Sequence, residues 1–199
     1  IMRQQLENIE RVFRSEARTT IVVGFKLEMI MEAHPNATFV YNENYDQTNT
    51  SKSLLKALRA SQESGVLWMN GDVVFDSRVL ERVSERIRNE KSFVCVNTSA
   101  TAEEEVKYTV DAKGHINALS KQVQSALGEA VGINFISRHH KKAVIQRLNE
   151  VADNDYFERG IEVSIEKDGA AFIPVDISDL FAVEVDFPED LERANESVR

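Results

Sequence analysis

Apolar residues along this chain fall into short unbroken runs and repeats at helical spacing, and the two patterns alternate. Unbroken runs of β-branched and aromatic residues are typical of strands buried on both faces. Such runs, with one hairpin, predict strands at 20–24, 37–41, 66–69, 92–96, 106–110, 116–119, 129–136, 171–175 and 180–185. Helical repeats begin near Met2, Leu27, Lys52, Val79, Ser137, Tyr156 and Pro188. This order predicts an α/β domain with a mixed, mostly parallel sheet.

The opening helix has one apolar face, formed by Met2, Leu6, Ile9 and Phe13 at helical spacing. A helix with a single apolar stripe usually packs that stripe against the core. We therefore expect these residues to form its packing face.

The stretch 66–76 carries the strongest candidate chemistry. A four-residue apolar strand ends at the turn Asn70-Gly71, and Asp72 follows at the carboxyl edge, where open α/β sheets place ligands. Gly71 would let a phosphate or a metal approach the backbone closely. Asp72 is a candidate ligand for a hard cation such as Mg²⁺, although an aspartate here could also simply cap a turn. Asp186, at the end of a later strand, is a second carboxylate placed in the same way.

Three other polar features indicate no specific chemistry by their pattern alone. The loop 42–51, rich in Asn, Thr and Ser, could offer donors to an anion or a nucleobase, but its pattern favours a capped, solvated loop. The acidic run 102–105 is expected to be a solvated loop. Lys121, which follows a strand, is by pattern alone a surface charge.

Composition narrows the class of protein. A chain of 199 residues suits one domain, 1–199, and its net charge of −9 argues against a nucleic-acid binder. The single cysteine, Cys95, lies in an apolar run, so neither a disulfide framework nor a cysteine metal site is expected. No apolar run is long enough to span a membrane, and no secretory segment is evident, so we expect a cytoplasmic protein. Nothing in the sequence specifies an oligomeric state.

Five blocks in order resemble the sugar nucleotidyltransferase superfamily, and most closely its phosphocholine cytidylyltransferase-like branch. The resemblance spans almost the whole chain, although each block alone is weak. The blocks are 21–25; 42–45 with Thr48-Asn49 and Ser53-Leu54; Asn70-Gly71-Asp72; 118–121 with 128–133; and Glu184-Val185-Asp186 with 189–191.

The resemblance implies a Rossmann-like three-layer α/β/α domain that transfers a nucleoside monophosphate, with CTP as the favoured donor, and releases pyrophosphate. By similarity, Asp72 and Asp186 would hold a catalytic Mg²⁺, and Lys121 would meet the acceptor phosphate. Asn49, Ser53 and Gly71 would lie on the nucleotide side. Glu129, Tyr156 and Glu158 would border the acceptor pocket.

The chain departs from the family pattern at two points. The family's first strand and its glycine-rich triphosphate loop are not found, so we expect the domain to lack them in the given sequence. Where relatives often carry a tryptophan before the last motif, this chain has Ala182. The acceptor could therefore be phosphocholine or a smaller compound such as 2-aminoethylphosphonate.

Four alternatives remain open. One is a sugar-1-phosphate uridylyl- or thymidylyltransferase, and a second is a nucleotide-binding domain without catalytic activity. A metal-dependent glycosyltransferase would be expected to show Asp-x-Asp, whereas Asp72 and Asp76 are separated by three apolar residues. A purely structural α/β domain would not need both strand-end carboxylates.

Overall fold

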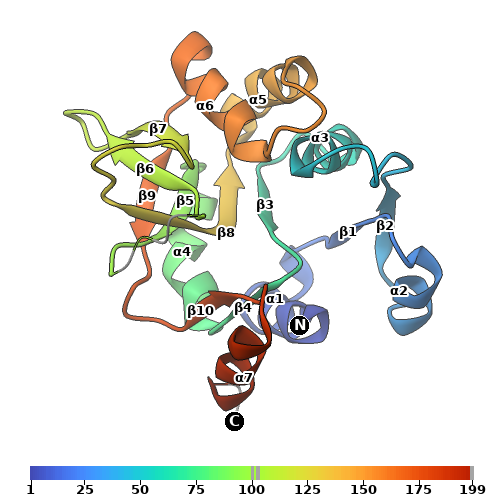
Figure 1. Ribbon diagram of the computed structural model, residues 1–199. Helices are drawn as coiled ribbons and strands as arrows, with labels where there is room; N and C mark the ends of the chain where they lie inside the picture. The colour runs from blue at the N-terminus through green and yellow to red at the C-terminus, as the bar shows by residue number, and fades with distance from the viewer. Residues whose placement is uncertain (100, 102–103, 198–199) are drawn as a thin grey trace.

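The computed structural model describes residues 1–99, 101 and 104–197, which form the elements drawn in Figure 1. The helices are α1 (Met2–Phe13), a 3₁₀ turn (Arg14–Glu16), α2 (Leu27–Ala33), α3 (Thr50–Ala60), α4 (Arg78–Arg88), α5 (Arg138–Glu150), α6 (Phe157–Asp168) and α7 (Pro188–Ser197). The strands are β1 (Thr20–Val23), β2 (Thr38–Tyr41), β3 (Val66–Met69), β4 (Val73–Phe75), β5 (Phe93–Asn97), β6 (Lys107–Val110), β7 (Ile116–Ser120), β8 (Gly128–Ile136), β9 (Ile173–Asp176) and β10 (Ala182–Glu184).

The central sheet is organised around β8, which pairs antiparallel with β3, β5 and β6. Its remaining pairings are β5 with β9, which is parallel, and β6 with β7, which is an antiparallel hairpin. The predicted mixed sheet is confirmed, but it is less parallel than expected. Among the described strands only β1–β2 and β5–β9 are parallel pairs, because β8 runs opposite to each of its neighbours.

Helices cover both faces of this sheet, which confirms the three-layer α/β/α class (Figure 1). On one face, the buried side chains of α3, α5 and α6 form a core that includes Leu58, Leu148 and Ile161. On the other face, α4 contributes Val79, Leu80 and Val83 to a second core, with residues of α1 at its margin. Cys95 lies fully buried in the second core, as its apolar surroundings predicted.

In α1, Ile9 and Phe13 of the predicted apolar face pack against the second core, but polar residues of the same helix are buried more deeply. Its buried residues are Gln5 and Asn8, whereas Leu6, Ile9 and Phe13 are only partly buried. The amide of Asn8 donates to the carbonyl of Phe75 at 2.8 Å, and the amide of Gln4 donates to the same oxygen at 2.6 Å. The polar face of α1 is buried because its amides satisfy backbone carbonyls of β4.

Strands β1 and β2 pair with each other and form a sheet apart from the central one. In the described part of the chain, no strand joins β1 to β3. The expectation that 1–199 is a single domain lacking the family's first strand and triphosphate loop is not tested by these pairings and stays a prediction.

None of the helices in the described ranges combines the length and the apolar character needed to cross a lipid bilayer.

Candidate functional site

The turn between β3 and β4 places Asp72 against two other strands. The backbone N–H of Asn70 donates to the carbonyl of Gly132 on β8 at 2.9 Å. The carbonyl of Asp72 accepts from the N–H of Val185 at 3.1 Å, just after the end of β10. Because β10 also pairs with β4, the predicted strand-end carboxylates Asp72 and Asp186 are brought to one edge of the fold.

Asp186 is held by the start of α7. Its N–H donates to the carboxylate of Asp190 at 3.2 Å, and the N–H of Phe187 donates to the same oxygen at 2.9 Å. Asp190, in the first turn of α7, therefore accepts from the backbone N–H groups that precede the helix, as the carboxylate of a capping box does. The Asp186 side chain remains exposed.

Glu105, Glu184 and Asp186 form a carboxylate cluster in which one oxygen of each lies within 4.8 Å of the others. Asp72 adjoins this cluster, and its Oδ1 is buried without a hydrogen-bond partner among the described residues. Burial raises the pKa of Asp72, and the negative charge of Asp186 raises it further. Burial, with the charges of Asp72 and Glu105, raises the pKa of Glu184 to about 7.

This set of groups fits a hard divalent cation. Such ions are bound by carboxylate oxygens, and a bound cation would relieve the repulsion that raises these pKa values. The buried Oδ1 of Asp72 has no hydrogen-bond partner in the described ranges, so it is the oxygen that a bound cation would stabilise most. Asp72, Asp186, Glu184 and Glu105 are therefore the residues that could hold a metal ion.

Two glycines near Asp72 differ in how much room they leave. A Cβ on Gly71 would meet no atom within 4 Å, so the turn has open space beside it. At Gly132, where φ is +63°, a Cβ would lie 2.6 Å from Oε1 of Glu184 and 2.8 Å from Nδ2 of Asn70. The close approach that needs a glycine therefore occurs at Gly132, between the carboxylates and β8.

Lys121 lies beside predicted residues of the acceptor pocket. Its ammonium group is 4.7 Å from the centre of the Tyr156 ring, in a cation–π arrangement. Tyr156 is 45% exposed, but Glu158, in the first turn of α6, is only 8% exposed. Burial raises the pKa of Glu158 to about 7, while the charge of Lys121 lowers it and that of Glu105 raises it.

Charge interactions link Lys121 and Glu158 to the carboxylate cluster. The charge of Glu105 acts on both Glu158 and Glu184, and the charges of Glu129 and Lys121 act on Glu105. The structure thus brings together seven of the predicted residues, namely Gly71, Asp72, Asp186, Lys121, Glu129, Tyr156 and Glu158. Their individual roles remain predictions.

Asn49 and Ser53 lie in the loop and helix beside the start of α6. Asn49 is the N-cap of α3, where its Oδ1 accepts from the N–H of Thr50 at 2.7 Å and its Nδ2 donates to the carbonyl of Asn154 at 3.3 Å. The hydroxyl of Ser53 accepts from the amide of Asn42 at 3.1 Å. Both side chains thus have structural partners, as the capped-loop interpretation predicts, and contact with a nucleotide remains a prediction.

Two residues of the carboxylate cluster were missed from the sequence. Residues 104 and 105 form a loop as expected, and Glu104 is exposed, but the expected solvation is wrong for Glu105, which is partly buried and whose pKa is raised by burial. Residues 102 and 103 of the same run lie outside the described residues. Glu184 could have been found, because residues i and i+2 of an extended segment lie on the same side, which places it with Asp186.

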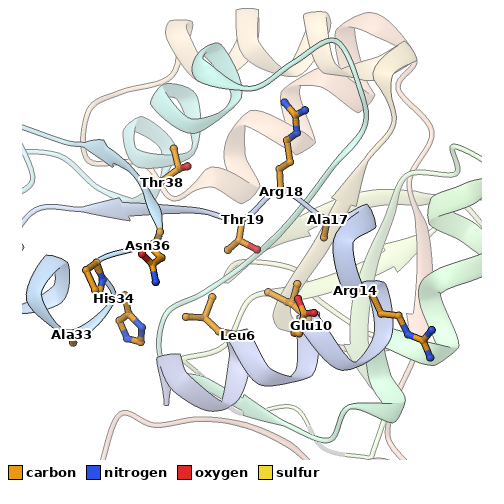
Figure 2. Close-up of a pocket in the computed structure, with 13 residues that line it drawn as sticks. Leu6, Glu10, Arg14, Ala17, Arg18, Thr19, Ala33, His34, Asn36 and Thr38 are labelled. Atoms are coloured by element: carbon orange, nitrogen blue, oxygen red, sulfur yellow. The ribbon is translucent and has the colours of Figure 1, made fainter.

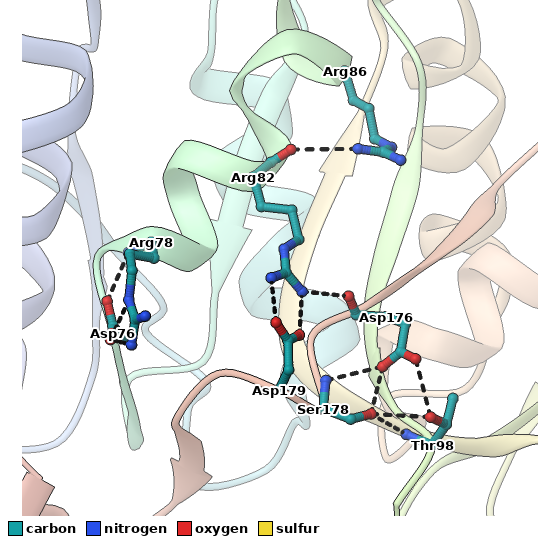
Figure 3. Close-up of polar contacts among 8 residues, drawn as sticks. All are labelled: Asp76, Arg78, Arg82, Arg86, Thr98, Asp176, Ser178 and Asp179. Atoms are coloured by element: carbon teal, nitrogen blue, oxygen red, sulfur yellow. Dashed lines mark hydrogen bonds and ion pairs between the residues drawn. The ribbon is translucent and has the colours of Figure 1, made fainter.

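The connection between β9 and β10 is anchored to α4 (Figure 3). The guanidinium of Arg82 donates to both carboxylate oxygens of Asp179, at 2.5 and 2.7 Å, and to the carbonyl of Asp176 at 3.0 Å. Asp176 in turn accepts from the N–H of Ser178 at 2.9 Å. These bonds fix the path that leads into β10, and so to Glu184 and Asp186.

A separate cavity of about 610 Å³ lies between α1 and the starts of β1 and β2 (Figure 2). Leu6, Glu10, Arg18 and His34 are among the residues that line it. Within the described part of the chain, its lining shares no residue with the carboxylate cluster. This cavity is therefore distinct from the candidate site.

Comparison with known proteins identifies the class. Residues 2–151 match the model of the MobA-like NTP transferase domain. The chain therefore belongs to the MobA-like NTP transferase family, and its class of activity is nucleotidyl transfer. No curated protein sequence matches it.

Several solved nucleotidyltransferases share its fold. The inositol-1-phosphate CTP transferase from T. maritima superposes with a TM-score of 0.78 at 12% identity, over 99% of this chain and 81% of that one. A proposed glucose-1-phosphate thymidylyltransferase from Bacillus anthracis gives 0.75 at 11% identity, over 98% and 80%. The CTP:phosphocholine cytidylyltransferase from Streptococcus pneumoniae gives 0.70 at 14% identity, over 98% and 83%. These likenesses show the fold, and they leave the substrates of this chain open.

Proposed function

We propose that this protein transfers CMP from CTP to a small phosphate or phosphonate that also carries an ammonium group, such as 2-aminoethylphosphonate or phosphocholine, and releases pyrophosphate. The observation that carries the proposal is the joining of two oppositely charged groups in one site. The carboxylates of Asp72, Glu184 and Asp186 lie together, and the ammonium of Lys121 lies over Tyr156. Glu105 interacts with both groups through its charge.

The reaction needs little covalent chemistry from the protein. An acceptor oxygen attacks the α-phosphate of the nucleotide, a P–O bond forms, and the bond to pyrophosphate breaks with its electron pair leaving on the pyrophosphate. Asp72 and Asp186, with Glu184 and Glu105 beside them, would hold Mg²⁺, which when bound neutralises charge that develops on the phosphates. Lys121 would orient the acceptor phosphate, and the open space beside Gly71 would admit the nucleotide phosphates.

The ammonium group of the acceptor is proposed from the surroundings of Lys121. Oε2 of Glu158 is buried and has no hydrogen-bond partner among the described residues. A buried carboxylate oxygen without a donor is costly, and an acceptor ammonium would supply both a donor and a positive charge. A primary ammonium satisfies this oxygen better than a quaternary one, which has no N–H, so 2-aminoethylphosphonate is favoured over phosphocholine.

CTP as the donor is supported by two of the similar structures, one described as an inositol-1-phosphate CTP transferase and one as a CTP:phosphocholine cytidylyltransferase. A second candidate function is transfer of a uridylyl or thymidylyl group to a sugar 1-phosphate. It is favoured by the proposed glucose-1-phosphate thymidylyltransferase, whose TM-score of 0.75 exceeds the 0.70 of the phosphocholine enzyme.

Pyrophosphate release tests both candidates. Purified protein is incubated with Mg²⁺ and each of CTP, UTP and dTTP, against 2-aminoethylphosphonate, phosphocholine, inositol 1-phosphate and glucose 1-phosphate. We expect release that requires CTP and an amine-bearing acceptor, and that is lost in Asp72→Asn. Release with UTP or dTTP and a sugar phosphate would instead establish the second candidate. Release with no pairing would contradict both.

A further inference from the structure

The buried amide of Gln5 joins the first helix to the turn that carries Asp72. Gln5 is 6% exposed, and its Nε2 donates to the carbonyl of Asn70 and to the carbonyl of Val73, each at 2.8 Å. These two carbonyls lie on either side of Gly71-Asp72. One side-chain amide therefore bridges the two ends of the turn, from an element distant in sequence.

This bridge adds to contacts that hold the same turn from other directions. The N–H of Val73 donates to the carbonyl of Asn70 at 3.4 Å, a long bond that constrains the turn weakly. The amide of Asn70 donates to Oε1 of Glu184 at 3.2 Å. The two bonds of Gln5 are shorter than either of these. A shift of the Gln5 side chain would therefore move Asp72 through the backbone and Glu184 through Asn70.

The neighbouring amides of α1 provide an internal comparison. Asn8 is 8% exposed and donates to the carbonyl of Phe75 at 2.8 Å, so it matches Gln5 in burial and in bond length. Its partner lies at the far end of β4, and it has no described bond to the turn. Gln5 makes two bonds, whereas Asn8 makes one, to a carbonyl that also accepts from Gln4, so their contributions to stability can differ. A purely structural role for both amides would nevertheless leave metal affinity unchanged when either is removed.

We propose that Gln5 is a positioning residue that sets the orientation of Asp72 and thereby the affinity of the carboxylate cluster for a divalent cation. The inference rests on the proposed role of Asp72 in holding the metal. Groups that orient metal ligands without touching the metal commonly change metal affinity 10- to 100-fold when removed. Gln5 acts through two backbone carbonyls, so we expect an effect of about tenfold.

The test compares Gln5→Met with Asn8→Leu, since each substitution keeps approximate size and removes the donor. Binding of Mn²⁺ in the absence of nucleotide is measured by electron paramagnetic resonance, and thermal unfolding is measured without metal. We expect about tenfold weaker Mn²⁺ binding in Gln5→Met and less than twofold change in Asn8→Leu, although both lower the melting temperature. If Gln5→Met does not fold, Gln5→Ala, which leaves room for a bridging water, replaces it.

The proposal would be overturned if Gln5→Met and Asn8→Leu bind Mn²⁺ equally well, whether both keep the wild-type affinity or both lose it to the same extent. Unchanged Mn²⁺ binding in Asp72→Asn would overturn it as well, since Asp72 would then not be a ligand. If Asp72→Asn and Gln5→Met both weaken binding while no nucleotide and acceptor pair yields pyrophosphate, the proposed reaction fails and the role of Gln5 stands.

Discussion

The carbonyl of Asp72 accepts a hydrogen bond from the N–H of Val185 at 3.1 Å, which joins the turn after β3 to the end of β10. Asp186 follows Val185 directly and Glu184 precedes it, so this bond, together with the pairing of β10 with β4, brings the carboxylates together. Like charges gathered in this way are costly in the absence of a counter-charge. This repulsion is why neutralising Asp72 or Glu184 is expected to change both stability and metal binding.

Replacing Asp72 with Asn should separate function from stability. The amide keeps the shape but removes a charge that would hold the cation, so we expect pyrophosphate release to fall at least about a hundredfold. Because burial already raises the pKa of Asp72, the neutral side chain should leave the melting temperature unchanged or higher. Asp76→Asn is the matched control, since Asp76 pairs with Arg78. It should retain activity, and equal loss of activity in both variants would contradict the assignment.

The stability of the protein without metal should fall as the pH rises from about 5 to 8. The pKa of Glu184 is raised to about 7 from an ordinary 4.5, so the folded state holds a proton that the unfolded state has released. The resulting stabilisation is complete below pH 4.5 and is lost as the pH passes 7. Glu184→Gln should therefore raise the melting temperature at pH 8 but not at pH 5. A difference that does not depend on pH would show that the pKa is not raised.

Gly132→Ala should cost more stability than Gly114→Ala. Both glycines have positive φ, 63° and 80°, so each alanine should carry about 1–2 kcal/mol of backbone strain. At Gly114 a Cβ meets nothing within 4 Å, whereas at Gly132 it meets Glu184 and Asn70. Urea unfolding of the two variants isolates the cost of this contact. Similar free energies of unfolding would mean that Glu184 and Asn70 move aside freely.

Lys121→Met should raise the KM for the acceptor more than the KM for the nucleotide. The ammonium of Lys121 is held over Tyr156, and its loss removes a positive charge from the proposed acceptor phosphate while the stem can still pack on the ring. Lys113→Met, at the far end of the same hairpin, removes an exposed charge away from Tyr156 and should change neither value. Steady-state kinetics with each substrate varied in turn decides the point. A larger effect on the nucleotide would place Lys121 on the other side of the site.

The sequence did not predict the three-residue strand β4, but it did predict the order of the other strands and of the helices. The hairpin before Lys121 and the places of Asp72 and Asp186 at strand ends were also readable from it. These features depend on local hydrophobic periodicity and turn residues, which each segment carries on its own. The family was also recognisable, because its motifs are short and keep their order.

Tertiary structure decided the rest. Three features depend on segments far apart in sequence. They are the burial of Glu105 and Glu158, the antiparallel course of β8 against its neighbours, and the burial of Gln5 more deeply than the apolar residues of α1. No local pattern encodes the partner of a polar side chain. A buried amide or carboxylate is tolerated only where distant groups satisfy it, so its place is determined when those groups meet.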